Sequence, residues 1–167
     1  MENKILLGGL LLIFLCGCSS KVEKVKPMVN ISPIELTNIN QSQLLTLINK
    51  ARSEAKECGT EHKEAVDPLA WNETLERIAY NHSKDMATNN FFSHTGSDGK
   101  LPSQRLDDSG YTWSRSAENI GNGYLNEKAV VRGWLVSRDH CVNIMDGHFT
   151  QMGIAKDGEF WTQVFTN

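Results

Sequence analysis

WLVSRDHCVNIMDGHFTQMGI, residues 134–154, is the stretch that constrains the fold most. Its middle part, Ser137 to Met145, has the pattern of a short helix. Its end runs into a hairpin that we predict over residues 151–156 and 159–165, joined by the turn Asp157-Gly158. The stretch therefore predicts a helix followed by paired C-terminal strands.

Besides the short helix over Ser137 to Met145, four helices are predicted before the hairpin. Ser42 caps one that runs toward Cys58, Asn72 caps a second, Pro102 starts a short third and Asn126 caps a fourth. Residues 111–123 carry no helical stripe and predict a loop or a short strand. Helices followed by a hairpin, with a strand before it, predict one mixed α+β domain over residues 41–167.

The first residues have the parts of an export signal. Lys4 supplies a positive charge, and the apolar run from Ile5 to Phe14 is too short to span a bilayer comfortably. The four residues that end the run, Leu-Cys-Gly-Cys at 15–18, resemble the bacterial lipobox. We predict a lipoprotein signal peptide over residues 1–17 and a lipid on Cys18 that anchors the protein to a membrane. The alternative is an ordinary secretory signal with two incidental cysteines.

The chain after Cys18 is expected to hold the domain off that membrane. Residues 18–40 are polar and lack a helical stripe, which predicts a lipidated flexible tether. The net charge is −3 and no basic patch stands out, so we expect no nucleic-acid partner. The predicted location is the cell envelope outside the cytoplasm. Because Ser19 rather than Asp follows Cys18, the outer membrane is expected if the bacterium has two membranes.

The chain has four cysteines, and the signal peptide and the lipid remove two of them from the fold. Cys58 and Cys141 remain, and an exported compartment permits them to form a disulfide. The alternative is two buried free thiols, since Cys packs as a small hydrophobe. We expect the disulfide because of the compartment.

Four motifs in order carry a family resemblance. They are Phe91-Phe92-Ser93-His94, Ala117-Glu118-Asn119-Ile120, the run from Trp134 to Met145, and the run from Gly147 to Ile154. Together they resemble the CAP superfamily of cysteine-rich secretory, antigen 5 and pathogenesis-related proteins, and in particular its bacterial SCP-like branch, over residues 44–167. The resemblance implies an α-β-α sandwich with a small central antiparallel sheet. A cysteine at the positions of Cys58 and of Cys141 also resembles a bacterial subset of the family.

The resemblance implies a cavity lined by two histidines and two acidic residues. His94 and His148 match the histidines, and Glu118 matches the first Glu, with Ala117 in place of the usual Gly before it. Ser137 stands where the second Glu usually lies. His140 belongs to the bacterial H-x-x-N-I pattern, and we expect it to cap or hydrogen-bond structurally. His82 lies on the apolar face of the second helix and is predicted to be a core histidine.

Three roles for this cavity follow from its chemistry. The side chains could form a structural network, His94 and His148 could bind Zn²⁺ or another divalent cation, or Glu118 could act as a general base. The common nucleophile, zinc-protease, phosphate-loop and dinucleotide motifs are absent from the sequence. We therefore favour a non-enzymatic module that binds a lipid, a small ligand or an envelope or host protein. The alternative is a metal-assisted or Glu/His-based hydrolase resembling a peptidase.

Overall fold

The computed structural model describes residues 38–167. The predicted signal peptide, the lipid site at Cys18 and the tether up to residue 37 lie outside these residues. Within the described part, no helix has both the length and the apolar character needed to cross a membrane.

The centre of the domain is a sheet of four strands, in the spatial order β3 (Ala70–Trp71), β5 (Gln151–Asp157), β6 (Phe160–Thr166) and β4 (Ser116–Asn122). The predicted hairpin is confirmed, because β5 and β6 pair antiparallel and Gly158 adopts the φ of +56° that their turn requires. β4 pairs antiparallel with β6 and forms one edge. The expectation of a purely antiparallel sheet needs one correction, since β3 pairs parallel with β5. This two-residue strand leads directly into a helix, and its pairing is too short to leave a periodic signal.

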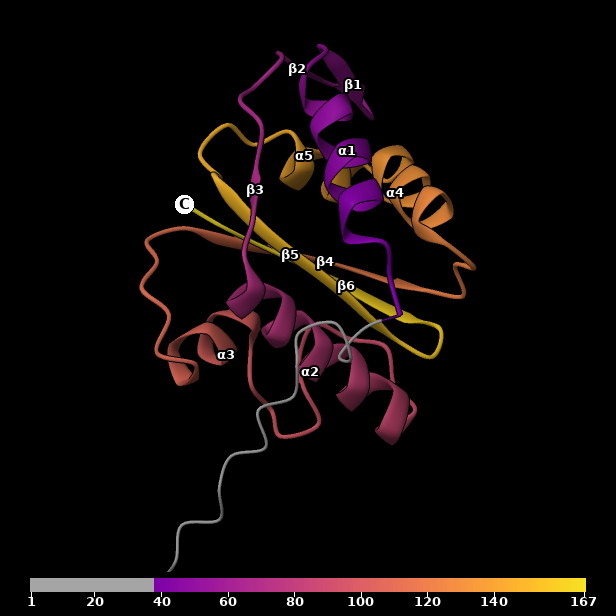
Figure 1. Ribbon diagram of the computed structural model, residues 1–167, viewed down its shortest axis with the longest axis vertical. Helices are drawn as coiled ribbons and strands as arrows, with labels where there is room; N and C mark the ends of the chain where they lie inside the picture. The colour runs from indigo at the N-terminus through magenta and orange to yellow at the C-terminus, as the bar shows by residue number, and fades with distance from the viewer. Residues whose placement is uncertain (1–37) are drawn as a thin grey trace, which may run out of the picture. The chain divides into compact units, whose positions relative to one another are not determined.

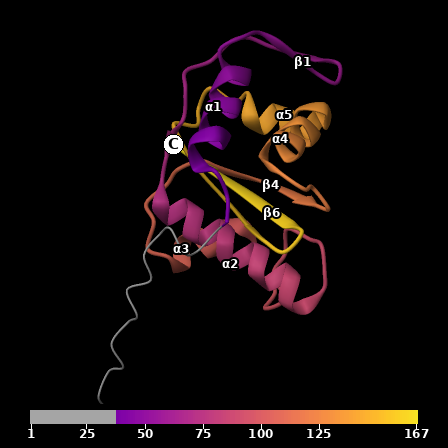
Figure 2. The same ribbon diagram turned by 45° about the vertical axis from the view of Figure 1, so that its right-hand side comes forward.

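Helices cover both faces of the sheet, which confirms the α-β-α sandwich (Figures 1 and 2). One layer contains α1 (Gln41–Arg52), α4 (Glu127–Val136) and α5 (Arg138–Ile144). The other contains α2 (Glu73–Asn89) and α3 (Pro102–Asp108). A separate small hairpin of β1 (Lys56–Cys58) and β2 (Glu61–Lys63) follows α1.

The helix starts follow the expected capping chemistry, with one shift. The side chains of Asn72 and Asn126 cap α2 and α4 as predicted. The cap of α1 is Asn40 rather than Ser42, because the Asn40 side chain accepts a hydrogen bond from the backbone N–H of Gln43. α1 also ends at Arg52 instead of continuing toward Cys58. The chain turns there into the β1–β2 hairpin, which places Cys58 against α5.

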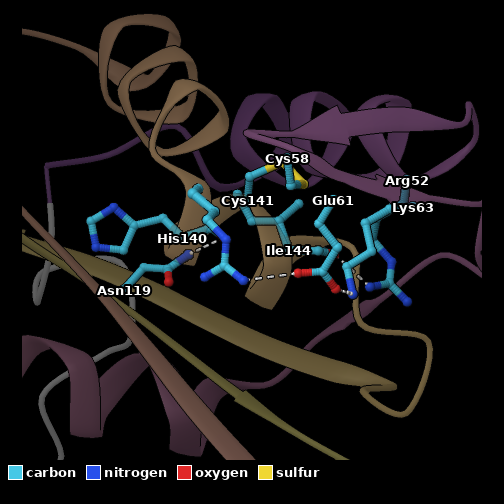
Figure 3. The surroundings of a disulfide bond; sticks show 9 residues. Arg52, Cys58, Glu61, Lys63, Asn119, His140, Cys141 and Ile144 are labelled. Carbon is cyan, nitrogen blue, oxygen red and sulfur yellow. Dashed lines mark hydrogen bonds and ion pairs between the residues drawn. A yellow bond between two sulfur atoms is a disulfide. The ribbon is translucent and has the colours of Figure 1, made fainter.

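A disulfide and a buried arginine hold the layer of α1, α4 and α5 together. The disulfide between Cys58 and Cys141 is confirmed, and it joins β1 to α5 across 83 residues of sequence (Figure 3). The Arg52 side chain is fully buried. Its guanidinium donates hydrogen bonds to four backbone carbonyls, those of Asp67, Ile144, Asp146 and Phe149. Arg52 thereby holds the loop between α5 and β5 against the end of α1.

α2 lies unusually close to the sheet at Gly153 in β5. A Cβ atom at Gly153 would come within 2.1 Å of the backbone nitrogen of Glu76 and 2.4 Å of the carbonyl carbon of Leu75. Only glycine allows this approach of helix backbone to strand. The approach sets the position of α2, and with it the position of the residues described next.

Candidate functional site

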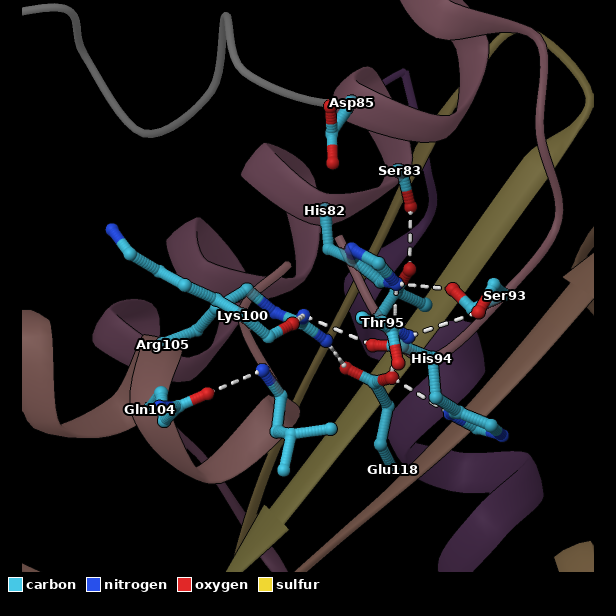
Figure 4. Close-up of polar contacts among 12 residues, drawn as sticks. His82, Ser83, Asp85, Ser93, His94, Thr95, Lys100, Gln104, Arg105 and Glu118 are labelled. Atoms are coloured by element: carbon cyan, nitrogen blue, oxygen red, sulfur yellow. Dashed lines mark hydrogen bonds and ion pairs between the residues drawn. The ribbon is translucent and has the colours of Figure 1, made fainter. Parts of the chain in front are cut away.

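Glu118 in β4 is the centre of a buried polar network between the sheet and the layer formed by α2 and α3 (Figure 4). Side chains alternate along a strand, so Glu118 faces this layer while Asn119 faces α5. The Glu118 side chain is 2% exposed and both oxygens are engaged. Oε2 accepts a hydrogen bond from Arg105 Nη2 at 2.7 Å, and Oε1 lies 2.8 Å from His94 Nδ1. A buried carboxylate requires such partners.

Arg105 in α3 positions both members of this pair. Its Nη2 binds Glu118, and its Nη1 donates to the backbone carbonyls of His94 and Lys100 at 3.0 Å and 2.9 Å. The guanidinium therefore links the buried carboxylate to the loop that carries His94. Arg105 acts as a positioning residue for the histidine.

His94 brings the network to the surface. It lies in the loop after α2, and 49% of its side chain is exposed. Because an ionised carboxylate only accepts hydrogen bonds, the Nδ1 atom that faces Glu118 carries a proton. In the neutral ring, Nε2 then has a lone pair available to a ligand or a cation.

His82 in α2 contacts the same loop from its buried side. Its side chain is fully buried, and its Nε2 lies 2.9 Å from the Ser93 carbonyl and 3.8 Å from Glu118 Oε1. Burial lowers the pKa of His82 and outweighs the opposite effect of Glu118. The neutral ring donates its Nε2 proton to Ser93 and so fixes the residue next to His94. The prediction of a buried core histidine is confirmed, with a contact to the site that it did not include.

His140 in α5 is the second imidazole close to His94. Burial and, secondly, the electrostatic influence of His94 lower the pKa of His140. The His140 backbone carbonyl accepts a hydrogen bond from Asn119 Nδ2. The structural role expected of the His140 side chain stays a prediction.

His148 and Ser137 lie in different surroundings. The His148 ring is 70% exposed, and its Nδ1 lies 2.7 Å from Asp146 Oδ1. Within residues 38–167, no hydrogen bond or ion pair joins His148 to His94 or Glu118. Ser137 is the residue between α4 and α5, and its side chain makes no capping hydrogen bond. The joint role predicted for these residues therefore stays a prediction.

The same holds for the expected metal. Across residues 38–167 no group of three or more His, Cys, Asp or Glu side chains is placed to hold a metal ion. His94 and His148 each have a carboxylate at Nδ1, which leaves one ring nitrogen on each histidine for a cation.

The network leaves two chemical possibilities at the surface, ligand binding and proton transfer, both through His94 Nε2. A general base needs a lone pair directed at a substrate, whereas both Glu118 oxygens already accept hydrogen bonds inside the protein. What reaches the surface is the outer edge of His94, held in one orientation. Arg105 and His82 were missed as members of the network. The one signal in the sequence that points to Arg105 is the short helix that Pro102 starts soon after the His94 motif.

Comparisons with known proteins match most of the domain. A family model described as the cysteine-rich secretory protein family, CAP, matches residues 45–165. The uncharacterized membrane protein YlbC of Bacillus subtilis is 28% identical over 131 residues, which is 78% of this chain and 35% of that protein. The uncharacterized protein YkwD of the same species is 32% identical over 105 residues, 62% of this chain and 41% of that protein.

A solved structure agrees with these matches. An extracellular protein containing a SCP domain from Bacillus anthracis shares 30% identity and a TM-score of 0.68, covering 75% of this chain and 39% of that one. The chain thus spans between 35% and 41% of the length of these three proteins. The likeness concerns the domain rather than the whole of each relative.

Proposed function

The chain belongs to the cysteine-rich secretory protein (CAP) family, and from this premise we propose that it is an extracytoplasmic binding or interaction module. Its contact point is the exposed edge of His94. The observation that carries the proposal is that Arg105 and His94 occupy both oxygens of the buried Glu118. Such a network fixes one imidazole at the surface and leaves neither oxygen of Glu118 free to act as a base.

The place where the module acts is the outside of the cytoplasmic membrane. The relative in Bacillus anthracis is an extracellular protein, and YlbC of Bacillus subtilis is a membrane protein. Both names fit an exported domain held near a membrane, and the disulfide fits an oxidising compartment. In this proposal the lipid on Cys18 anchors the module, and its ligand is a lipid, a small molecule or an envelope or host protein.

The test follows the His94 imidazole by NMR while candidate ligands are added to the purified chain. Short-chain phospholipid, peptidoglycan fragments and Zn²⁺ are added separately, and the same samples are assayed for cleavage of casein and peptidoglycan. We expect a saturable shift of the His94 signal with one class and no turnover. His94→Ala should abolish binding, and His62→Ala should leave it unchanged because His62 is exposed on β2. Turnover that is lost in Glu118→Gln would establish the hydrolase instead.

A further inference from the structure

A second cavity lies beside the Glu118 network, on the side of Arg105 and Lys100 rather than of the His94 ring (Figure 4). It is enclosed by α2, α3 and the loop of residues 96–100, and its volume is about 440 Å³. Binding sites for small molecules are commonly of this size. His82 and Arg105 line it together with Arg77 and Asn81 of α2. His94 does not line this cavity, so a ligand bound there would serve a role beyond the proposed function.

Two residues that line this cavity, His82 and Arg105, each carry a buried polar atom without a partner. In residues 38–167 the buried side-chain atoms without a hydrogen bond are His82 Nδ1 and Arg105 Nε. His82 is neutral and its proton is on Nε2, so Nδ1 is an acceptor that lacks a donor. Arg105 Nε is a donor that lacks an acceptor. Unpaired buried groups are costly, and a site for a ligand is one reason for a protein to keep them.

Three basic and three acidic side chains line the cavity, so its charges balance in number. Lys100 Nζ pairs with Asp98 at 3.3 Å and with Asp108 at 2.8 Å. Asp85 accepts hydrogen bonds from the backbone and the hydroxyl of Ser97. Neither an anion nor a cation is therefore favoured. What the two unpaired atoms lack is a donor for His82 Nδ1 and an acceptor for Arg105 Nε, and one ligand can supply both.

Hydroxyl groups meet this requirement, because each one donates and accepts. We propose that the cavity binds a neutral sugar unit, one hydroxyl of which donates to His82 Nδ1 while it or its neighbour accepts from Arg105 Nε. Arg77 and Asn81, both exposed at the cavity wall, supply further donors to the remaining hydroxyls. Less than 1 Å² of either unpaired atom is exposed, so the proposal includes a small shift of the cavity wall, for which the loop of residues 96–100 is the candidate segment, as the sugar enters.

The experiment titrates the purified chain with glucose and N-acetylglucosamine and, as charged counterparts, with glucose 6-phosphate and glucosamine. Binding is measured by calorimetry, and hydrogen exchange follows the backbone amides of Gly96 and Ser97. We expect at least one neutral sugar to bind saturably, more tightly than its charged counterpart, and to change exchange in the loop. Absence of saturable binding by both neutral sugars, or tighter binding of a charged one, would overturn the proposal.

Variants separate the cavity from the fold and, except for His82→Phe, whose ring also holds Ser93 beside His94, from the His94 site. His82→Phe keeps a ring but removes the acceptor, and we expect it to weaken sugar binding about tenfold, as the loss of one hydrogen bond predicts. Arg77→Ala and Asn81→Ala keep the buried structure and should each weaken binding about fivefold. Arg132→Ala on α4 is the matched control for an exposed arginine and should change nothing. Unchanged binding in all three cavity variants would refute the site, whereas unchanged binding in His94→Ala is expected and keeps the two proposals distinct.

Discussion

The two faces of the sheet bury different kinds of side chain. Under α1, α4 and α5 lies a cluster of fifteen buried apolar residues, which includes Trp134 and Phe165, closed by the disulfide and by Arg52. Under α2 and α3 the apolar cluster has six members, and Glu118 and His82 are buried beside it. Apolar burial stabilises a fold without directing any group, whereas a buried polar network costs stability and fixes orientations. The first face therefore carries most of the stability, and the second positions the site.

The largest effect is expected from Arg52→Ala on the apolar face. Removal of the guanidinium leaves four backbone carbonyls, two of them in buried hydrogen bonds, without their donor and should cost about 5 kcal/mol of unfolding free energy. Urea denaturation followed by circular dichroism measures it. Arg132→Ala, an exposed arginine, should stay within about 0.5 kcal/mol. Equal effects of the two variants would contradict the role given to Arg52.

The disulfide comes next. Its loss in a Cys58→Ser, Cys141→Ser variant releases a loop of 83 residues and should cost about 4 kcal/mol in the chain-entropy model. Thermal unfolding with and without reductant provides the measurement. In the double variant, reductant should have no further effect. A wild-type midpoint that does not respond to reductant would show that the bond contributes nothing to stability.

Gly153→Ala tests the face that carries the site. The added methyl group would collide with the backbone of α2, so the helix must move, at a cost of about 3 kcal/mol. Because α2 carries His82, the His94 NMR signal should shift as well. Gly147→Ala meets only the Val66 side chain and is the matched control. A His94 signal that stays in place would mean that α2 does not position the site.

Glu118→Gln keeps the shape of the side chain and removes its charge. Arg105 then loses its charged partner, and we expect a loss of about 2 kcal/mol together with greater mobility of the His94 loop. Chemical denaturation and hydrogen exchange of residues 93–97 report the two effects. Glu127→Gln removes a carboxylate that accepts from the Asn40 backbone at the surface, and it should leave the loop unchanged. If both variants behave alike, the conclusion that the face under α2 and α3 positions the site is wrong.

The smallest effect is a pH dependence that arises on the site face. Burial lowers the pKa of His82 below its ordinary value of 6.5, so the unfolded chain binds this proton more readily than the folded one. The stability contributed by neutral His82 is present above pH 6.5 and is lost as the pH falls through the folded pKa. The slope of unfolding free energy between pH 5 and 7 should decrease in His82→Phe. His62→Gln serves as the control, because Glu57 raises the pKa of His62 and its contribution has the opposite sign.

The sequence predicted elements where the signal is local. Asn72 and Asn126 cap helices through bonds to residues two or three positions ahead, and the turn at Gly158 joins adjacent strands. The start of α1 was displaced by two residues because Asn40, which also contacts Glu127 of α4, competes successfully with Ser42. The end of α1 was wrong because the disulfide partner of Cys58 lies 83 residues away.

The sequence by itself determined the family, the layers of the fold, the pairing of the two cysteines and the presence of His94 and Glu118 in one site. Only the tertiary structure decided that Arg105 and His82 complete this site, and that His148 contacts Asp146. The physical reason is the range of each interaction. Caps and turns are formed by neighbours in sequence, whereas Glu118 reaches Arg105 and His94 across 13 and 24 residues. Those contacts exist only once α2 has packed against Gly153 and the two layers have closed on the sheet.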